Sequence, residues 1–480
     1  MARPKITSFS LYKYRYIIGY LLLAVLFATL LILAGIYVPG GLSANEKLSV
    51  IDSAAMTWRD PRTWLMIDAP YHLLQAGILS LFGASEFTIK LPSLIIGLLT
   101  GIGLLFLLRR WFPASIAVLA STIAIVTGQF LFIAQSGAPL IMHIFWPVLI
   151  LLLGTQVTRT KSHRFAWKIV FTIAAALSLY TPLSIYVLLA VVATIALHPH
   201  LRLTIKRMSV VRISTCVAIA IILTAPLIWL SISNSAAGLE LLGLSQLPID
   251  VVSNLKQLAS QYLLFWQPDA GEILTPVFGL ATTLLIGLGV YRLIRTSQTT
   301  RSYLIMIWLL LLAPIAVLHP ESTAILTLPA VLLLAAGLTS LIKYWYRLFP
   351  LNPYARIAGL IPIVVLISVM LGSGIDRYMY GYHYAPGLAS NFSRDLALLP
   401  SDTNILVVTE EEADFYKAIA DYRDKLSVLT TIPDNGTYAM TAAAYQKSTV
   451  DPTEISQIIT NESANNANRF YIVATPNDKN

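Results

Sequence analysis

The sequence predicts an all-α polytopic membrane protein with a small α/β domain at its C-terminal end. Of the 480 residues, 56% are hydrophobic and only 12% are charged, whereas an ordinary globular domain carries about 25% charged residues. Apolar windows of about 18 residues or more recur along the chain, and each is long enough to cross a bilayer as a helix. The single cysteine, Cys216, excludes an internal disulfide and a zinc site built from cysteines.

Apolar segments that are expected to cross the membrane number about eleven. They are roughly 16–38, 89–108, 113–132, 139–157, 166–180, 182–198, 210–231, 274–294, 302–318, 322–342 and 355–375. The first is too long for the apolar core of a cleavable signal peptide, so we expect it to remain as a membrane helix. Within the apolar run 166–198, Pro182 predicts a break between two crossings, since proline disfavours helix for the residue before it.

The basic residues lie in every second connection between these segments. The connections are the N-terminus, Arg109-Arg110, 158–168, 199–212, 292–301 and 343–356, which together hold 20 of the 33 Lys and Arg and no Asp or Glu. The positive-inside rule places them in the cytoplasm. We therefore expect a multi-pass protein of the cell membrane with a cytoplasmic N-terminus and an extracytoplasmic C-terminus. The net charge of +9 then needs no nucleic-acid partner.

Three longer segments are predicted on the outer side: a first loop, 39–88, a second loop, 232–273, and the tail, 376–480. In the first loop, "YHLLQAGILSLFG" (71–83) is apolar but too short to span a bilayer, which predicts an interfacial or re-entrant helix. The second loop contains an amphipathic stretch at 251–266. The predicted domains are a membrane domain, 1–375, and an extracytoplasmic α/β domain, 376–480.

The tail has a pattern of strand, helix, strand, helix, strand. The five segments are "NILVV", "EEEADFYKAIADYRDK", "LSVLT", "DPTEISQIIT" and "RFYIVAT". The second helix is predicted from Asp451 as cap, Pro452 at the first position and Glu454 at the third. This alternation indicates a mostly parallel sheet. The tail has no glycine-rich phosphate loop, so we predict no nucleotide site.

A motif begins at the end of the interfacial helix. In "LFGASEFTIKLPSLIIGLLTGIGLLFLLRRWF" (81–112), eight residues match a phrase of the GT-C glycosyltransferase superfamily: Phe82, Gly83, Glu86, Phe87, Leu91, Pro92, Ser93 and Gly97. The chain most resembles the protein O-mannosyltransferase and aminoarabinose-transferase-like branch. The segment 319–337 also resembles the penultimate helix of that family. The resemblance covers most of the chain and is strongest over 40–112.

The resemblance implies an enzyme that transfers a sugar from a polyprenyl-phosphate donor to an acceptor at the outer face. The acceptor class stays open among protein, lipid and glycan, and membrane lipids surround the chain. An acid in the first loop would activate the acceptor hydroxyl or orient a divalent metal, Mg or Mn, although no cofactor is certain. Physical chemistry agrees, because glycosyl transfer passes through an oxocarbenium-like state and needs a nearby carboxylate.

Three parts of the family pattern are changed in this chain. The acidic pair Asp-Glu reads Asn45-Glu46, and Lys-Pro-Pro-Leu-Tyr reads 68–72, "DAPYH". The loop 133–143 lacks the expected acid and cation. Either other residues carry the chemistry, or the protein is a catalytically degenerate lipid- or glycan-binding protein on the same scaffold. A transporter is less favoured, because we find no internal repeat and the polar residues cluster at the outer edge.

The candidate catalytic residues are Glu46, Asp68 and Asn45. Glu46 follows the first membrane helix at the family's position, and Asn45 can orient a hydroxyl but cannot act as a base. Asp68 is either a base or the side-chain cap of the interfacial helix. Asp52 would lie about 120° around a helix from Glu46, so the two are not expected to form a pair.

The candidate substrate-binding residues share a place near the outer boundary. They are Arg59, Arg62, Lys90, His72, His143, His319 and Glu321. The arginines suit a phosphate or else pair with Asp60, and Lys90 contacts a phosphate or extends to the helix end. His143 lies inside a membrane helix, where ionisable groups tend to be functional. His319 and Glu321 flank Pro320 and could hold a metal or an acceptor.

The charge pattern yields a test of topology. A reporter fused after Asn480 should be extracytoplasmic, and one inserted at residue 162 should be cytoplasmic, because the basic connections stay inside. Alkaline phosphatase and fluorescent-protein activities of the fusions measure this directly. A cytoplasmic C-terminus would mean that the true number of crossings differs from eleven by an odd number. The segment 166–198 would be the first place to look for the miscount.

Overall fold

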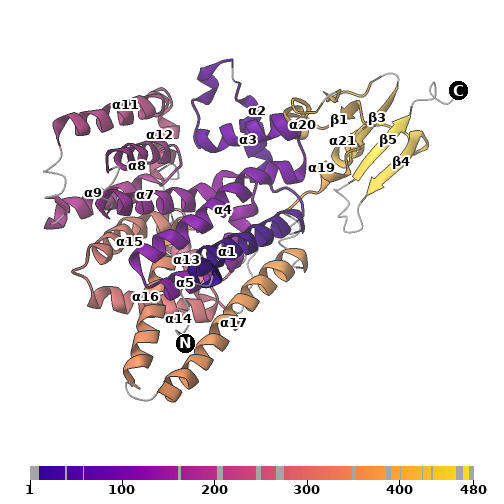
Figure 1. The fold of residues 1–480 in the computed structure, drawn as a ribbon. Helices are drawn as coiled ribbons and strands as arrows, with labels where there is room; N and C mark the ends of the chain where they lie inside the picture. The colour runs from indigo at the N-terminus through magenta and orange to yellow at the C-terminus, as the bar shows by residue number, and fades with distance from the viewer. Residues whose placement is uncertain are drawn as a thin grey trace.

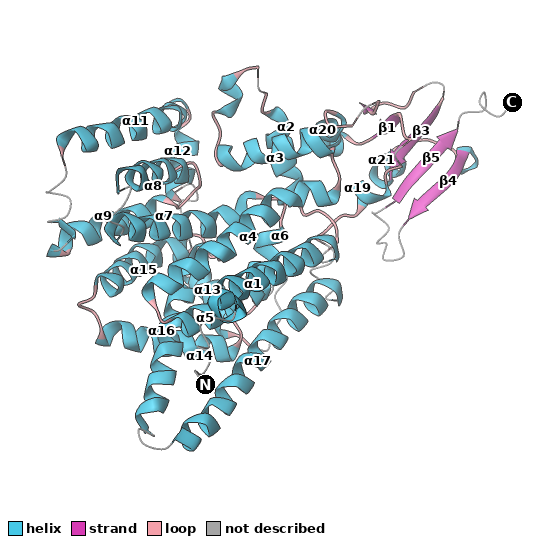
Figure 2. Ribbon diagram, viewed as in Figure 1, coloured by secondary structure: helices cyan, strands magenta, loops and turns pink. Residues whose placement is uncertain are grey.

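The computed structural model describes fourteen segments of the chain. They are 10–37, 40–57, 59–159, 164–199, 201–202, 209–244, 250–265, 275–348, 353–384, 391–400, 402–423, 425–433, 436–460 and 469–474. Helices make up the main body, and a small sheet lies at one end next to the C-terminus (Figures 1 and 2). The predicted class, helical membrane protein plus a small sheet domain, is confirmed at this level.

Six helices in the described segments are long and apolar enough to cross a membrane. The qualifying stretches are Glu86–Trp111, Pro139–Thr158, Val210–Ser233, Thr300–Leu318, Ala324–Leu348 and Ala358–Gly381. They belong to α4 (Glu86–Trp111), η3 (Pro139–Ile141) with α7 (Met142–Arg159), α11 (Val210–Ser233), α15 (Thr300–Leu318), α16 (Ala324–Leu348) and α17 (Pro353–Tyr384). The chain is therefore a multi-pass membrane protein, whereas eleven crossings stays a prediction.

Helices whose apolar stretches are shorter occupy most of the other predicted crossings. They are α1 (Ser10–Tyr37, apolar over Ile17–Leu33), α8 (Arg164–Ser178), α9 (Ile185–Leu197) and α14 (Leu280–Arg295). The expected break at Pro182 is confirmed, because α8 ends before it and α9 begins after it. The predicted crossing at 113–132 is not a single straight helix. It consists of α5 (Ala114–Val126) and α6 (Gly128–Gln135), which meet at 66°.

The bend between α5 and α6 has a local cause at Thr127. This residue leaves the helical conformation (φ −62°, ψ 139°), and its hydroxyl accepts a hydrogen bond from the Phe130 amide at the start of α6. The threonine thus ends one helix and caps the next. As a result, α6 packs against α4. The contact is close at Gly97, where an added Cβ atom would lie only 2.7 Å from the Cβ atom of Ala134.

The first outer loop contains two helices, as its sequence indicates. The interfacial helix is α3 (Ala69–Phe82), and α2 (Ala44–Ala55) precedes it, with a short 3₁₀ helix η2 (Pro61–Trp64) between them. The second outer loop contributes α12 (Ser235–Leu242) and α13 (Val251–Leu263), the latter at the predicted amphipathic stretch. In Figure 1, α2 and α3 lie side by side at the top of the view, whereas α12 lies next to α11.

The C-terminal sheet has five strands in the order β2-β1-β3-β5-β4. The strands are β1 (Ile405–Val407), β2 (Ser427–Leu429), β3 (Thr437–Thr441), β4 (Ile455–Thr460) and β5 (Arg469–Ala474), and the helices are α19 (Asp395–Leu398), α20 (Glu410–Ala420) and α21 (Ala442–Lys447). The pairs β1–β2 and β1–β3 are parallel, whereas β3–β5 and β5–β4 are antiparallel. The sheet is therefore mixed rather than mostly parallel.

The predicted helix at 451–460 is wrong. Asp451 does act as a cap, but the helix is only the single 3₁₀ turn η4 (Pro452–Glu454), after which the chain becomes β4. The segment "ISQII" is rich in β-branched isoleucine, which favours strand, and β5 lies beside it to accept the pairing. Tertiary pairing therefore overrides the local start signal.

The C-terminal domain packs directly on α2. Leu42 and Ser393 form an isolated antiparallel bridge, with Leu42 N to Ser393 O at 2.8 Å. Lys47 on α2 lies 3.7 Å from the Asp395 carboxylate, and the Tyr422 hydroxyl donates to the Ser53 carbonyl at 3.3 Å. A shared apolar core joins the two parts, with Leu42, Val50, Leu79, Ala84 and Ile89 from one side and Leu396, Leu406, Ala413, Phe415 and Ile419 from the other.

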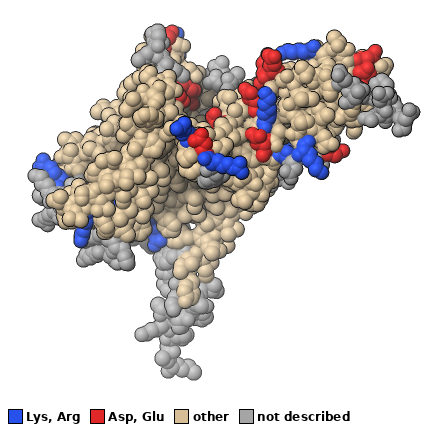
Figure 3. All heavy atoms as spheres, turned by 90° about the horizontal axis from the view of Figure 1, so that it is seen from above, with Lys and Arg blue, Asp and Glu red and all other residues tan. Residues whose placement is uncertain are grey.

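Charged side chains are unevenly placed over the surface. In Figure 3, seen from above, only Lys and Arg appear at the left end, and a broad band of uncharged surface follows. Both signs of charge occur from the middle of this face to the C-terminal domain. This arrangement agrees with the basic connections of the sequence, which contain no acids, and with an apolar belt between two solvent-exposed ends.

The helices α14 and α16 approach each other so closely at two glycines that no larger residue would fit there. A Cβ atom on Gly289 would lie 2.0 Å from the Leu333 carbonyl oxygen, and one on Gly337 would lie 2.0 Å from the Leu285 carbonyl oxygen. Small residues at such positions let two membrane helices approach backbone to backbone. The two glycines are therefore required by the helix contact itself.

Gly289→Ala should destabilise the protein, because the new methyl group must push α14 away from α16. Overpacking of this kind costs about 1–3 kcal/mol, which should lower the melting temperature of the detergent-solubilised protein by several degrees. Gly287→Ala is the matched control on the same helix, since nothing lies within 4 Å of its Cβ position. Equal melting temperatures for the two variants would contradict the packing explanation.

Candidate functional site

The Glu46 carboxylate is fully buried and bonded from three sides. Its Oε2 accepts from the Ser43 amide at 2.7 Å, completing a capping box with the Ser43 hydroxyl at the start of α2. Its Oε1 accepts from the Gly137 amide at 2.5 Å and lies 3.9 Å from Lys90 Nζ. Glu46 and Lys90 are each only 1% exposed. This carboxylate therefore fastens α2 to α4 and to the loop that follows α6.

The loop 133–143, which lacks charges of its own, is held by charges from elsewhere. Lys90 on α4 donates to Gln135 Oε1 at 3.1 Å, and Glu46 binds the Gly137 amide. Lys90 therefore points inward rather than extending to the helix end, which corrects that expectation. A Cβ on Gly137 would meet Ile89 Cγ2 at 2.7 Å, so this loop lies directly against α4.

A second set of buried polar contacts surrounds Gln75 on α3. Its Oε1 accepts from the hydroxyls of Ser49 at 2.8 Å and Ser53 at 2.6 Å, and its Nε2 donates to the carbonyls of Ile89 at 3.0 Å and Gly137 at 2.8 Å. Gln75 is fully buried. All four hydrogen-bonding positions of its amide are filled, so the side chain joins α2, α3, α4 and the 136–138 turn.

His72 joins this set one turn before Gln75. Its Nδ1 lies 3.0 Å from the Ser53 hydroxyl, and the ring is only 4% exposed. Burial lowers the pKa of His72 to about 4, although the Ser49 carbonyl beside the ring favours the protonated form. The imidazole is therefore neutral at physiological pH.

Asp68 lies at the N-terminal end of α3 in a left-handed conformation (φ 52°). Its Oδ1 accepts from the Thr181 hydroxyl at 2.5 Å, and its amide donates to the Tyr180 carbonyl at 2.9 Å. The alternative expectation of a side-chain cap is wrong, because the carboxylate makes no cap hydrogen bond. It connects the first outer loop to the turn between α8 and α9 instead.

The environment of Asp68 disfavours its charge. Burial raises the pKa of Asp68 to about 7; the Thr181 hydrogen bond opposes this shift, and the negative charge of Glu240 on α12 adds to it. Partial burial also raises the pKa of Glu240, and the charge of Asp52 contributes. Acids from three outer elements thus influence one another. Asp52 itself is exposed on α2, whereas Glu46 is buried.

The other candidate residues lie outside this network. Arg59 and Arg62 are exposed beside η2, and in the described part of the chain neither forms a salt bridge with Asp60, whose carboxylate accepts the Arg62 amide at 3.0 Å instead. Asn45 is exposed on the first turn of α2. His143, on α7, hydrogen-bonds to the Pro182 carbonyl and lines a small space with Ser184.

His319 and Glu321 are brought together, as expected from their spacing. His319 Nδ1 lies 3.1 Å from Glu321 Oε1, and Nε2 lies 2.7 Å from the Gly243 carbonyl oxygen. Gly243 has a positive φ of 71°, and a Cβ there would meet Leu183 at 2.5 Å. This pair therefore holds the end of α12 against the turn between α15 and α16.

The structure thus gathers Glu46, Lys90 and His72 around Gln75, with Asp68 one turn before His72, at the start of α3. Sequence reasoning missed Gln75, Ser53, Gly137 and Thr181. The sequence did contain one signal: Gln75 is the one amide within the apolar segment 71–83, and a buried amide needs partners.

A metal ion has no evident ligand set here. Among the described residues, no group of three or more His, Cys, Asp or Glu side chains is arranged to hold one. The acids and histidines near α3 are instead used in hydrogen bonds to the protein. The residues therefore do not fit the divalent metal that was left open from the sequence.

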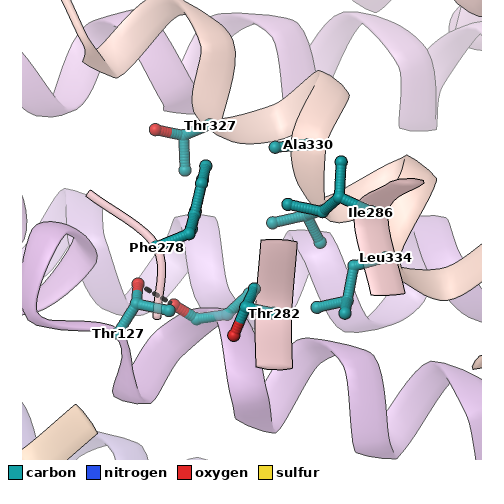
Figure 4. Close-up of a pocket in the computed structure, with 9 residues that line it drawn as sticks. Thr127, Phe278, Thr282, Ile286, Thr327, Ala330 and Leu334 are labelled. Carbon is teal, nitrogen blue, oxygen red and sulfur yellow. Dashed lines mark hydrogen bonds between the residues drawn. The ribbon is translucent and has the colours of Figure 1, made fainter. Parts of the chain in front are cut away.

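A small space elsewhere in the molecule is apolar and separate from these residues. It lies between α5, α14 and α16, and its lining includes Thr127, Phe278 and Thr327 (Figure 4). Phe278 lies between the two threonines, and the Thr127 hydroxyl is already bonded to the Ala124 carbonyl at 2.7 Å. None of the candidate residues lines it, so we regard it as a packing gap.

Comparisons with known proteins support the resemblance to GT-C glycosyltransferases. The family model described as dolichyl-phosphate-mannose-protein mannosyltransferase matches residues 70–229. The fold is similar to ArnT from Cupriavidus metallidurans bound to undecaprenyl phosphate, with TM-score 0.55 and 12% identity over 95% of this chain and 98% of that chain. The apo state of ArnT gives TM-score 0.51 at 12% identity, with the same shares of both chains.

A more distant likeness extends to an archaeal enzyme. The oligosaccharyltransferase of Archaeoglobus fulgidus, tethered with an acceptor peptide, gives TM-score 0.50 and 15% identity over 86% of this chain and 64% of that chain. No curated protein sequence matches significantly. At these identities the structural matches show the fold. The resemblance inferred from 81–112 is thereby confirmed, because the family model and the fold agree with it.

Asp68→Asn should stabilise the protein at alkaline pH. The pKa of Asp68 is about 7 in the folded protein and near 3.8 in a free chain, so the folded state binds more protons between these values. Stability of the wild type therefore falls as pH rises from about 4 to 7. Asparagine can still accept from Thr181 without a charge, which should yield a gain on the order of 2–4 kcal/mol at pH 8.

Thermal unfolding at pH 4.5 and pH 8 measures this effect. The difference between Asp68→Asn and wild type should grow from the lower to the higher pH. Asp52→Asn is the control on an exposed face and should show a much smaller change. A variant that is less stable than wild type at both pH values would contradict the burial argument.

Proposed function

We propose that the chain is a membrane glycosyltransferase that moves a sugar from a polyprenyl phosphate to an acceptor hydroxyl at the outer face. The observation that carries the proposal is the segment 39–88, where an ionisable carboxylate, Asp68, begins the helix α3 that also carries His72 and Gln75 of the buried polar network. The fold likeness over nearly the whole chain supports it, since the similar ArnT structure contains undecaprenyl phosphate. The acceptor stays open among protein, lipid and glycan.

Asp68 is the proposed general base. The acceptor oxygen attacks the anomeric carbon of the sugar, and the bond between that carbon and the phosphate oxygen breaks. The phosphate leaves with the electron pair on the lipid, and the proton of the acceptor hydroxyl passes to Asp68. A base works best when its pKa is near the working pH, and burial has raised the pKa of Asp68 to about 7.

Glu46 has a different proposed role from Asp68. Its two oxygens are occupied by the amides of Ser43 and Gly137, and Lys90 neutralises its charge. These contacts support a positioning role, in which the carboxylate keeps α2 against α4. Asn45, its exposed neighbour, is then placed to orient a hydroxyl group. The proposal assigns no step to a metal.

The exposed arginines suit the phosphate of the donor. Arg59 and Arg62 lie on the same outer loop as Asp68, and a planar guanidinium can bind phosphate oxygens in pairs. Neither guanidinium forms a salt bridge in the described segments. They are therefore available to a ligand at the loop surface. The positive-inside rule disfavours arginines on an outer loop, which is a further reason to assign them a role.

One observation favours a second candidate function, a degenerate binding protein. The acid expected at position 45 is an asparagine, and the adjacent Glu46 is committed to three contacts within the protein. On this reading the lipid phosphate is still bound but no transfer occurs. The two functions differ in turnover, whereas lipid binding is common to both.

The transfer assay uses purified full-length protein in detergent with a polyprenyl-phosphate sugar. Asp68→Asn should lower the transfer rate about 10²–10⁴-fold, the usual contribution of a general base. The wild-type rate should rise with pH up to about 7, because only the ionised carboxylate can take the proton, and this rise should vanish in the variant.

Asp52→Asn is the matched control and should keep most of the activity. If Asp68→Asn turns over like wild type, the base has been assigned wrongly. If wild type binds the lipid phosphate with no turnover across acceptors of all three classes, the degenerate binding protein is the better description.

A further inference from the structure

The orientation of the Gln75 amide follows from its neighbours. One end of the amide faces two backbone carbonyls, those of Ile89 and Gly137 at 3.0 and 2.8 Å. Carbonyl oxygens only accept, so the end that faces them must be the NH₂ group. The Gln75 oxygen therefore faces the two hydroxyls of Ser49 and Ser53, and both hydroxyls must donate to it.

This orientation fixes the hydrogen of Ser53 in turn. A serine hydroxyl has one hydrogen, and in Ser53 it is directed at the Gln75 oxygen 2.6 Å away. The Ser53 oxygen can then only accept from His72 Nδ1, 3.0 Å away. A chain of three hydrogen bonds thus sets the tautomer of His72, with the proton on Nδ1.

The other ring nitrogen, Nε2, is then an acceptor with a bare lone pair. In the described part of the chain, Nε2 has no hydrogen-bond partner. It is also not one of the fully buried polar atoms without a partner, so a ligand can reach it. Burial keeps the ring neutral at physiological pH. A neutral imidazole whose tautomer is set by its far nitrogen offers a fixed acceptor to an incoming group.

We propose that His72 Nε2 accepts a hydrogen bond from a hydroxyl of the lipid-linked sugar. This inference rests on the proposed function and names the group that orients its donor. His72 lies four residues after Asp68, and its amide donates to the Asp68 carbonyl at 3.2 Å, so the two side chains start from the same side of α3. A sugar held at Nε2 would thus lie beside the carboxylate that takes the proton from the acceptor.

The tautomer can be tested without a ligand. Full-length protein labelled with ¹⁵N-histidine gives well-separated signals for protonated and bare ring nitrogens, and His72→Asn identifies the signals of this ring. At pH 7, His72 should show a protonated Nδ1 and a bare Nε2. Ser53→Ala should remove the constraint and produce a mixture. A protonated Nε2 in the wild type would overturn the inference.

The ligand is tested with two lipids, undecaprenyl phosphate and undecaprenyl phosphate carrying mannose. His72→Asn keeps a donor near the Nδ1 position and removes the acceptor at Nε2, whereas His72→Gln places an amide near the Nε2 position. His72→Asn should bind the mannose lipid about three- to tenfold more weakly than wild type. Its affinity for undecaprenyl phosphate should be unchanged, and His72→Gln should recover part of the loss.

The outcomes separate this inference from the proposed function. If His72→Asn weakens both lipids equally, or neither, the sugar contact is overturned even when wild type transfers the sugar normally. If wild type binds the mannose lipid and His72→Asn weakens it selectively but no transfer occurs, the contact stands and the transferase activity fails. If wild type binds neither lipid, both are overturned.

Discussion

The buried ion pair of Glu46 and Lys90 is the interaction on which the packing of α2 against α4 and the segment 135–137 depends. A charged pair removed from water is costly unless every remaining hydrogen-bonding position is filled. Here the amides of Ser43 and Gly137 donate to the carboxylate, and the amide oxygen of Gln135 accepts from the ammonium group. The groups involved come from three separate parts of the chain: the start of α2, α4 and the segment 135–137. Binding one carboxylate and one ammonium group therefore brings those parts together.

The arrangement around this pair is rigid, whereas the charges at its edge are not. Gln75 uses every hydrogen-bonding position of its amide, so the turn at 136–138 and the start of α4 have little freedom to move. Asp52, Glu240 and the two arginines of the same loop remain exposed. A rigid interior with a charged edge is how binding sites are usually constructed, since precise placement requires support from behind.

Much of the fold follows from local patterns in the sequence. The interfacial helix α3, the break at Pro182 and the helix α20 each have a strong local signal, and each is present. The segment 113–132 bends because Thr127, within the segment, caps α6, whereas β4 forms because β5, a separate segment, lies beside it. Likewise, Glu46 stands out in the sequence, but its partner Gly137 is 91 residues away, so nothing near Glu46 indicates that its carboxylate is occupied.

The bridge between Leu42 and Ser393 has a consequence for biosynthesis. The segment 39–88 is synthesised early, yet one surface of α2 is completed only by residues near the end of the chain. Contacts between such distant segments form late. Until then, Val50 and Leu79 have no apolar cover from the C-terminal domain, and an incomplete chain presents them to quality-control proteases and chaperones. The packing of α2 is therefore complete only after the C-terminal domain has been made and has folded.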